Sequence, residues 1–193
     1  MFTKYIKLVI ITTISVAGVI VCLALINKQY YNNLLNSNNQ KEIINTSPAL
    51  SKIISDTEMY RQKADNTCGI ASLAFILSHL GFNIQEEQLV THTQIPKEGA
   101  NLLILSNFTM NFGFQAYGRR SNYAALEKMF KPLIVHINGN HFMVLLEADK
   151  HKTICYDPSD GEYILFRRLD FLMIWDGIVL QILPSSIYVK RNK

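Results

Sequence analysis

The strongest constraint on the fold is a change of hydrophobic pattern at Pro132. Before this proline, apolar residues gather in runs that suit helices; after it, short segments rich in β-branched and aromatic residues alternate with Pro, Gly and Asn. We expect helices at residues 70–80, 85–93, 100–111 and 123–130, and strands at residues 133–137, 141–146, 153–157, 163–167 and 177–183. Helices followed by closely spaced strands predict an α+β domain with a largely antiparallel sheet.

An almost continuously apolar segment at residues 8–26 precedes this domain. It approaches the roughly 20 residues that a membrane-spanning helix needs, and no small-residue cleavage pattern follows it. We therefore expect one N-terminal transmembrane or signal-anchor helix. Lys4 and Lys7 favour a cytoplasmic N-terminus. The predicted location is the inner (cytoplasmic) membrane, single-pass, with the folded domain facing the periplasm or the cell exterior.

The chain divides into five segments by composition. They are a short basic N-terminus (1–7), the apolar helix (8–26), an Asn-rich linker (27–51), the folded domain (52–185) and a basic C-terminal tail (186–193).

The formal charge of +4 does not indicate a nucleic-acid-binding protein. The basic excess lies at the two ends of the chain, and acidic residues slightly outnumber basic ones between residues 51 and 183. No run of aromatic residues interleaved with Lys or Arg occurs there. We expect no nucleic-acid partner.

The three cysteines, Cys22, Cys68 and Cys155, are too few for a disulfide framework. No Cys or His spacing typical of a zinc site is present, so neither a metal nor a cofactor is expected. A bridge between Cys68 and Cys155 is formally open if the domain faces an oxidising compartment.

Cys68 is the candidate nucleophile because it opens the first predicted helix, where the helix dipole stabilises a thiolate. A hydrolytic thiolate needs an imidazole beside it and a third group that orients the imidazole. His141 begins a buried strand after the turn at residues 138–140, and Asp157 ends the next strand. His136 flanks the same turn, and the pattern alone leaves open that these are ordinary core residues.

The segment YRQKADNTCGIASLAFIL resembles the nucleophile region of the C39 family of bacteriocin-processing, double-glycine leader peptidases. A Gln six residues before Cys-Gly is typical of that family, and Gln62 and Cys68 fill these positions. The segments KEGANLLILSNFTMNFGFQAYG, PLIVHINGNHFMVLLEA, CYDPSDGEYILF and FLMIWDGIVLQI follow in the family's order, so the resemblance extends over roughly residues 59–183.

The resemblance implies a papain-like fold and a role for each of four residues. Cys68 would be the nucleophile, His141 the general base and acid, Asp157 the residue that orients His141, and Gln62 the oxyanion-hole donor. It also implies a peptide substrate cleaved after a Gly-Gly type leader. No Walker motif occurs in this chain, so an export transporter would be a separate protein or absent.

Two alternatives stay open at this point. The domain can be a non-catalytic, C39-like substrate-binding domain of a secretion system, or a papain-like acyltransferase that passes the acyl group to an amine or thiol. Thr67 also departs from the family, which commonly has an acidic residue directly before the nucleophile.

Overall fold

A computed structural model describes residues 60–82, 84–91 and 95–184. The predicted apolar helix at residues 8–26, the linker and the C-terminal tail lie outside the described residues. Within the described part, no helix combines the length and the apolar character needed to cross a bilayer.

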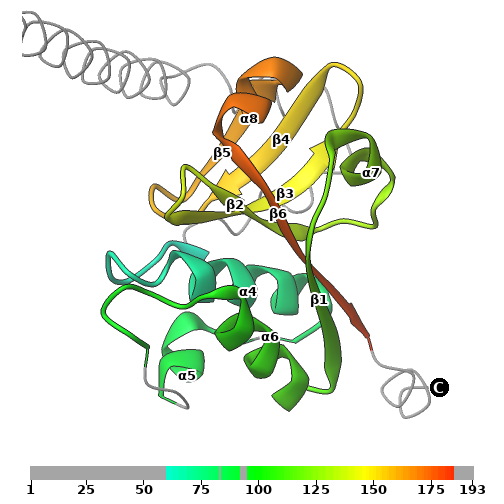
Figure 1. The fold of residues 1–193 in the computed structure, drawn as a ribbon. Helices are drawn as coiled ribbons and strands as arrows, with labels where there is room; N and C mark the ends of the chain where they lie inside the picture. The colour runs from blue at the N-terminus through cyan, green and yellow to red at the C-terminus, as the bar shows by residue number, and fades with distance from the viewer. Residues whose placement is uncertain (1–59, 83, 92–94, 185–193) are drawn as a thin grey trace, which may run out of the picture. The chain divides into compact units, whose positions relative to one another are not determined.

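The described chain forms five helices and six strands (Figure 1). The helices are α4 (Cys68–His79), α5 (Glu86–Val90), α6 (Leu102–Asn111), α7 (Tyr123–Lys128) and α8 (Arg168–Ile174). The strands are β1 (Phe114–Arg120), β2 (Leu133–Ile137), β3 (His141–Ala148), β4 (Lys152–Asp157), β5 (Glu162–Arg167) and β6 (Trp175–Pro184).

The six strands form one sheet in the order β1-β6-β2-β3-β4-β5, and every neighbouring pair is antiparallel. Helices α4, α5 and α6 gather on one side of this sheet, while α7 and α8 lie apart from them (Figure 1). The predicted α+β domain with an antiparallel sheet is confirmed.

Helix α4 is the centre of the core because its first ten residues are all buried. Apolar residues from alternate positions of the strands pack against it, including Ile134, Val144, Ile154 and Tyr156. The ring of Phe75 stacks on the ring of Tyr156 with centroids 4.9 Å apart. This contact joins the helical layer to the strand whose last residue is Asp157.

Two elements were not predicted from the sequence. Strand β1 lies at the edge of the sheet and is largely exposed, so its residues do not alternate between apolar and polar. Helix α8 is a short element between two strands, where Phe171 and Ile174 are buried. The expected order of helices first and strands afterwards was therefore wrong at these two places.

Candidate functional site

Cys68 is the first residue of α4, and 9% of its surface is exposed. Helix α4 approaches β3 closely here. A Cβ atom added to Gly69 would lie only 3.1 Å from Cδ2 of Phe142. Only glycine allows this approach without displacing a neighbour. The consequence is that the sulfur comes within hydrogen-bonding reach of the start of β3.

His141 and Asp157 meet at one end of the sheet, because β3 begins where its antiparallel neighbour β4 ends. Nε2 of His141 lies 2.8 Å from Oδ1 of Asp157. The turn before His141 contains Asn138 and Gly139, both with positive φ, as a tight reversal requires. Since Asp157 engages Nε2, Nδ1 is the ring nitrogen left for Cys68.

Cys68 and His141 stabilise each other's charged forms. Burial raises the pKa of the Cys68 thiol, but the hydrogen bond and charge of His141 and the backbone N–H groups of Phe142 and Gly69 outweigh it, so the pKa falls below the ordinary 9.0. Burial lowers the pKa of His141, yet its hydrogen bonds to Asp157 and Cys68 raise that pKa to about 10. The site therefore favours a thiolate–imidazolium pair.

Gln62 and Ser159 complete the polar surroundings of this pair. The Gln62 backbone N–H donates to the Pro158 carbonyl at 2.7 Å, and the Ser159 hydroxyl lies 3.5 Å from Oε1 of Gln62 and 3.3 Å from Nε2 of His141. The Ser159 backbone N–H donates to Oδ1 of Asp157 at 2.9 Å. The four residues predicted from the sequence thus lie together, with Ser159 among them.

Ser159 was not predicted as a site residue. The signal for it is the Asp-Pro-Ser order, because an Asp side chain commonly accepts a hydrogen bond from the backbone two residues later.

Cys155 has a different environment from Cys68. Both are free thiols, so no bridge joins them. Cys155 alternates with Ile154 and Tyr156, which face α4, and it is fully buried on the other side of the sheet. Burial and the charge of Asp157 raise its pKa well above the ordinary value.

His136, the other histidine beside the turn, has its own carboxylate. Its Nδ1 lies 2.7 Å from Oδ2 of Asp176, and the same oxygen accepts the Gly139 N–H at 2.9 Å. This pair holds the turn that leads to His141.

A groove of about 710 Å³ lies beside the site, between the segment before α6 and the β2–β3 turn. Its apolar wall is formed by Ala100, Leu102, Leu103, Phe142 and Ile178. Cys68, His141 and Gln62 do not line the groove, but Phe142 does, and its backbone N–H also bonds to Cys68. The groove therefore lies close to Cys68 and is a candidate site for a polypeptide segment.

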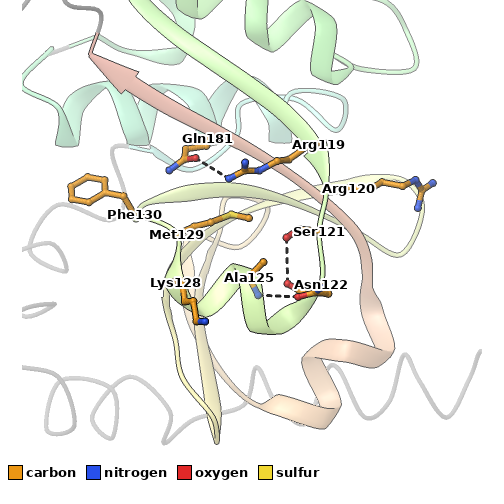
Figure 2. A pocket seen from close by; sticks show the side chains of 9 residues that line it. All are labelled: Arg119, Arg120, Ser121, Asn122, Ala125, Lys128, Met129, Phe130 and Gln181. Carbon is orange, nitrogen blue, oxygen red and sulfur yellow. Dashed lines mark hydrogen bonds between the residues drawn. The ribbon is translucent and has the colours of Figure 1, made fainter.

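A second hollow of about 590 Å³ lies between β1 and α7 and is lined by Arg119, Arg120 and Lys128 among others. Figure 2 shows Arg119 reaching toward Gln181, to which it donates a hydrogen bond at 3.2 Å, while Arg120 points away. Among the described residues that line this hollow, none carries a thiol, an imidazole or a carboxylate.

A buried thiol at a helix start, paired with an imidazole and a carboxylate on an antiparallel sheet, is the arrangement of a papain-like cysteine peptidase. The sequence profile of the Peptidase C39 family matches residues 56–187. The chain belongs to this family. Its domain is a cysteine peptidase domain, and the expected C39 resemblance is confirmed.

Two similar proteins are longer than the region that they share with this chain. Over 126 residues the chain is 28% identical to the "Probable microcin-H47 secretion/processing ATP-binding protein MchF" of Escherichia coli. The aligned region is 65% of this chain and 18% of that protein. Over 145 residues the chain is 30% identical to the "Probable functional amyloid protease FapD" of Pseudomonas fluorescens, which covers 69% of this chain and 63% of that protein. The chain thus spans about a fifth of the first relative and under two thirds of the second.

A solved structure of a double glycine motif protease from an AMS/PCAT transporter, in complex with the leader peptide, is also similar. The TM-score is 0.61 and the sequence identity is 29%, over 65% of this chain and 89% of that chain. The similarity therefore extends over most of that protease chain.

Proposed function

We propose that this C39 domain hydrolyses a peptide bond in a leader or secreted polypeptide, after a Gly-Gly type site, with Cys68 as the nucleophile. The observation that carries the proposal is the hydrogen-bonded series from Cys68 through His141 to Asp157 at the start of α4. The name of one similar protein, a double glycine motif protease, supports the Gly-Gly specificity, and the name of another, a secretion/processing protein, supports a secreted substrate.

In the first step, the Cys68 thiolate attacks the carbonyl carbon of the scissile bond. The negative charge that develops on the carbonyl oxygen is bound by the Gln62 side-chain amide and the Cys68 backbone N–H, an interaction typically worth about 3 to 4 kcal/mol. The imidazolium of His141 then gives its proton to the departing amine, which leaves a thioester on Cys68.

In the second step, neutral His141 takes a proton from a water molecule, and the resulting hydroxide attacks the thioester. The tetrahedral adduct collapses, Cys68 leaves as a thiolate, and His141 keeps the proton. Asp157 holds the imidazole ring through Nε2 in both steps, so Nδ1 stays directed at the sulfur and the substrate.

The substrate segment lies in the apolar groove beside Cys68. Leu103 is 68% exposed at its wall, although large apolar side chains usually avoid water. Apolar side chains of a leader peptide would cover it during binding.

The decisive test is replacement of Cys68 by Ala in the full chain, with Cys155→Ala as the matched control. A synthetic peptide with a Gly-Gly site is incubated with each protein, and the products are identified by mass. We expect Cys68→Ala to abolish cleavage with an unchanged thermal midpoint, and Cys155→Ala to cleave. Continued cleavage by Cys68→Ala would show that Cys68 is not the nucleophile. A product carrying an added amine rather than water would indicate the acyltransferase.

A labelling experiment tests the activation of Cys68 without a substrate. Iodoacetamide should modify Cys68 faster than Cys155 near neutral pH, because only Cys68 has a lowered pKa and an imidazole partner. Peptide mapping by mass spectrometry measures both rates. Equal rates would remove the case for an activated thiolate.

We further propose that residues 8–26 anchor the chain in the inner membrane, with the C39 domain outside the cytoplasm and a separate transporter exporting its substrate. The apolar run and the preceding Lys4 and Lys7 support this arrangement. Protease added to spheroplasts should digest the domain. Survival of the domain in intact spheroplasts, with digestion only after lysis, would reverse the assigned topology.

A further inference from the structure

Glu86 is a buried acidic residue outside the four proposed catalytic residues. It is the first residue of α5, and only 3% of its surface is exposed. Both of its carboxylate oxygens lie 3.1 Å from the backbone nitrogen of Lys63, whose N–H they share. The Thr67 hydroxyl helps to stabilise the charge of this carboxylate, but its own proton is donated to the Ala64 carbonyl at 2.8 Å, and it accepts the Ala64 N–H at 3.1 Å.

The contact with Lys63 holds one end of the segment that joins Gln62 to Cys68, because Lys63 directly follows Gln62. At the other end, Thr67 directly precedes Cys68 and closes the segment on Ala64. The carboxylate on α5 therefore acts at the Gln62 end of the segment, although no residue of α5 lines the substrate groove.

The contact at Lys63 determines the direction of the Gln62 side chain. The Gln62 N–H is fixed by the Pro158 carbonyl at 2.7 Å, and the next N–H along the chain is fixed by Glu86. Fixing the peptide planes on both sides of one residue fixes its φ and ψ, and hence the direction of its Cα–Cβ bond.

The burial of Glu86 is unfavourable by itself. Burial raises the pKa of its carboxyl group, because the charged form loses its hydration. The neighbouring Glu87 makes a contrasting contact with the same lysine, since its carboxylate lies 3.8 Å from Lys63 Nζ while both side chains remain more than half exposed. The buried Glu86 carboxylate accepts its hydrogen bond from the backbone directly after Gln62. This contact suggests that Glu86 is buried in order to fix the backbone conformation there.

We propose that Glu86 is a positioning residue for the oxyanion hole: its carboxylate fixes the backbone at Lys63 and thereby aims the Gln62 amide at the reacting carbonyl. The inference rests on the proposed function, in which Gln62 binds the oxyanion. Glu86 acts through Gln62 and does not contact the substrate.

The test compares Glu86→Gln and Glu86→Ala with the matched control Glu87→Gln in the full chain. Glu86→Gln keeps the shape and one acceptor oxygen, so we expect a loss of about tenfold in kcat, against about a hundredfold for Glu86→Ala, with little change in KM for a synthetic Gly-Gly peptide. Glu87→Gln should change kcat less than about twofold, because its ion pair is exposed.

Two further measurements separate positioning from general support of the fold. Alkylation of Cys68 by iodoacetamide forms no oxyanion, so Glu86→Gln should leave its rate within about twofold of wild type. In a Gln62→Ala background, Glu86→Gln should likewise add less than about twofold, because the two residues act on one interaction.

Several results would overturn the proposal. One is a Glu86→Gln variant with the kcat of the wild type. Another is a loss of kcat on Glu86→Gln that is as large in the Gln62→Ala background as in the wild type. A third is alkylation of Cys68 that slows in Glu86→Gln as much as turnover does. If Gln62→Ala alone keeps full kcat, both the oxyanion role of Gln62 and this inference are wrong, whereas the peptidase assignment is decided separately by Cys68→Ala. The thermal midpoint of each variant verifies folding, and Glu86→Gln is decisive if Glu86→Ala does not fold.

Discussion

Replacement of Asp157 by Asn tests the charge relationship at the centre of the site. The change keeps the shape of the side chain and removes its negative charge. Asp157 is 2% exposed and His141 20% exposed, so water screens their contact little. A hydrogen bond to a charged group contributes about 1.5 to 3 kcal/mol. At about 1.36 kcal/mol per pH unit, its loss lowers the pKa of His141 by about one to two pH units.

The sign of the effect follows from the two pKa values. In the wild type, activity should rise with pH as Cys68 loses its proton below 9.0 and fall as the imidazolium loses its proton near pH 10. In Asp157→Asn, the imidazolium is lost at lower pH, so the alkaline limb should move down to roughly pH 8 to 9. The weaker positive charge also raises the pKa of Cys68, so the acid limb moves up.

The assay is the pH dependence of kcat/KM for a Gly-Gly peptide, together with the pH dependence of alkylation of Cys68. For Asp157→Asn we expect a narrower bell-shaped pH profile of kcat/KM. Its maximum should be lower by roughly 100-fold, because His141 is no longer held in place. Asp170→Asn is the matched control, since this buried carboxylate pairs with Arg167 rather than His141 and should leave both limbs in place. Unchanged limbs in Asp157→Asn, or equal shifts in both variants, would refute the reasoning.

Two other changes test the packing and the groove. Gly69→Ala would place a methyl group 3.1 Å from Phe142 and 3.2 Å from Leu105, and the better helix propensity of Ala offsets part of this crowding, so we expect the free energy of unfolding in urea to fall by about 0 to 2 kcal/mol; a clear gain in stability would show that Phe142 and Leu105 move aside without cost. Leu103→Asp should raise KM with kcat nearly unchanged, since Leu103 lines the groove. The control Leu169→Asp changes a similarly exposed leucine on α8 and should leave KM unchanged. Equal effects on KM would argue against the groove as the substrate site.

Local sequence signals predicted where Cys68, His141 and Asp157 lie on their elements, but left open whether they act together. Cys68 follows residues that begin a helix, His141 follows a turn, and Asp157 ends a strand. Each signal gives a position on an element, and the antiparallel sheet then brings the two strand ends together. The family resemblance added Gln62, which lies in a loop and has no pattern of its own.

Glu86 could not be predicted because its burial is a property of the folded chain. Glu86 and Glu87 are adjacent in a polar segment, and both suit the first turn of a helix. Only the packing of α5 against the segment before Cys68 distinguishes the buried carboxylate from the exposed one. Strand β1 was missed for the opposite reason: an edge strand buries too little to leave an alternating pattern.

The separation of Cys155 from Cys68 has a consequence for oxidative chemistry. When a reactive thiolate is oxidised to a sulfenic acid, a nearby second cysteine can rescue it by forming a disulfide. Cys155 lies across the sheet and is fully buried, so within the described residues the nucleophile has no such internal partner. Recovery of an oxidised Cys68 would then require a thiol from outside the described residues, such as a small-molecule thiol or a separate reductase.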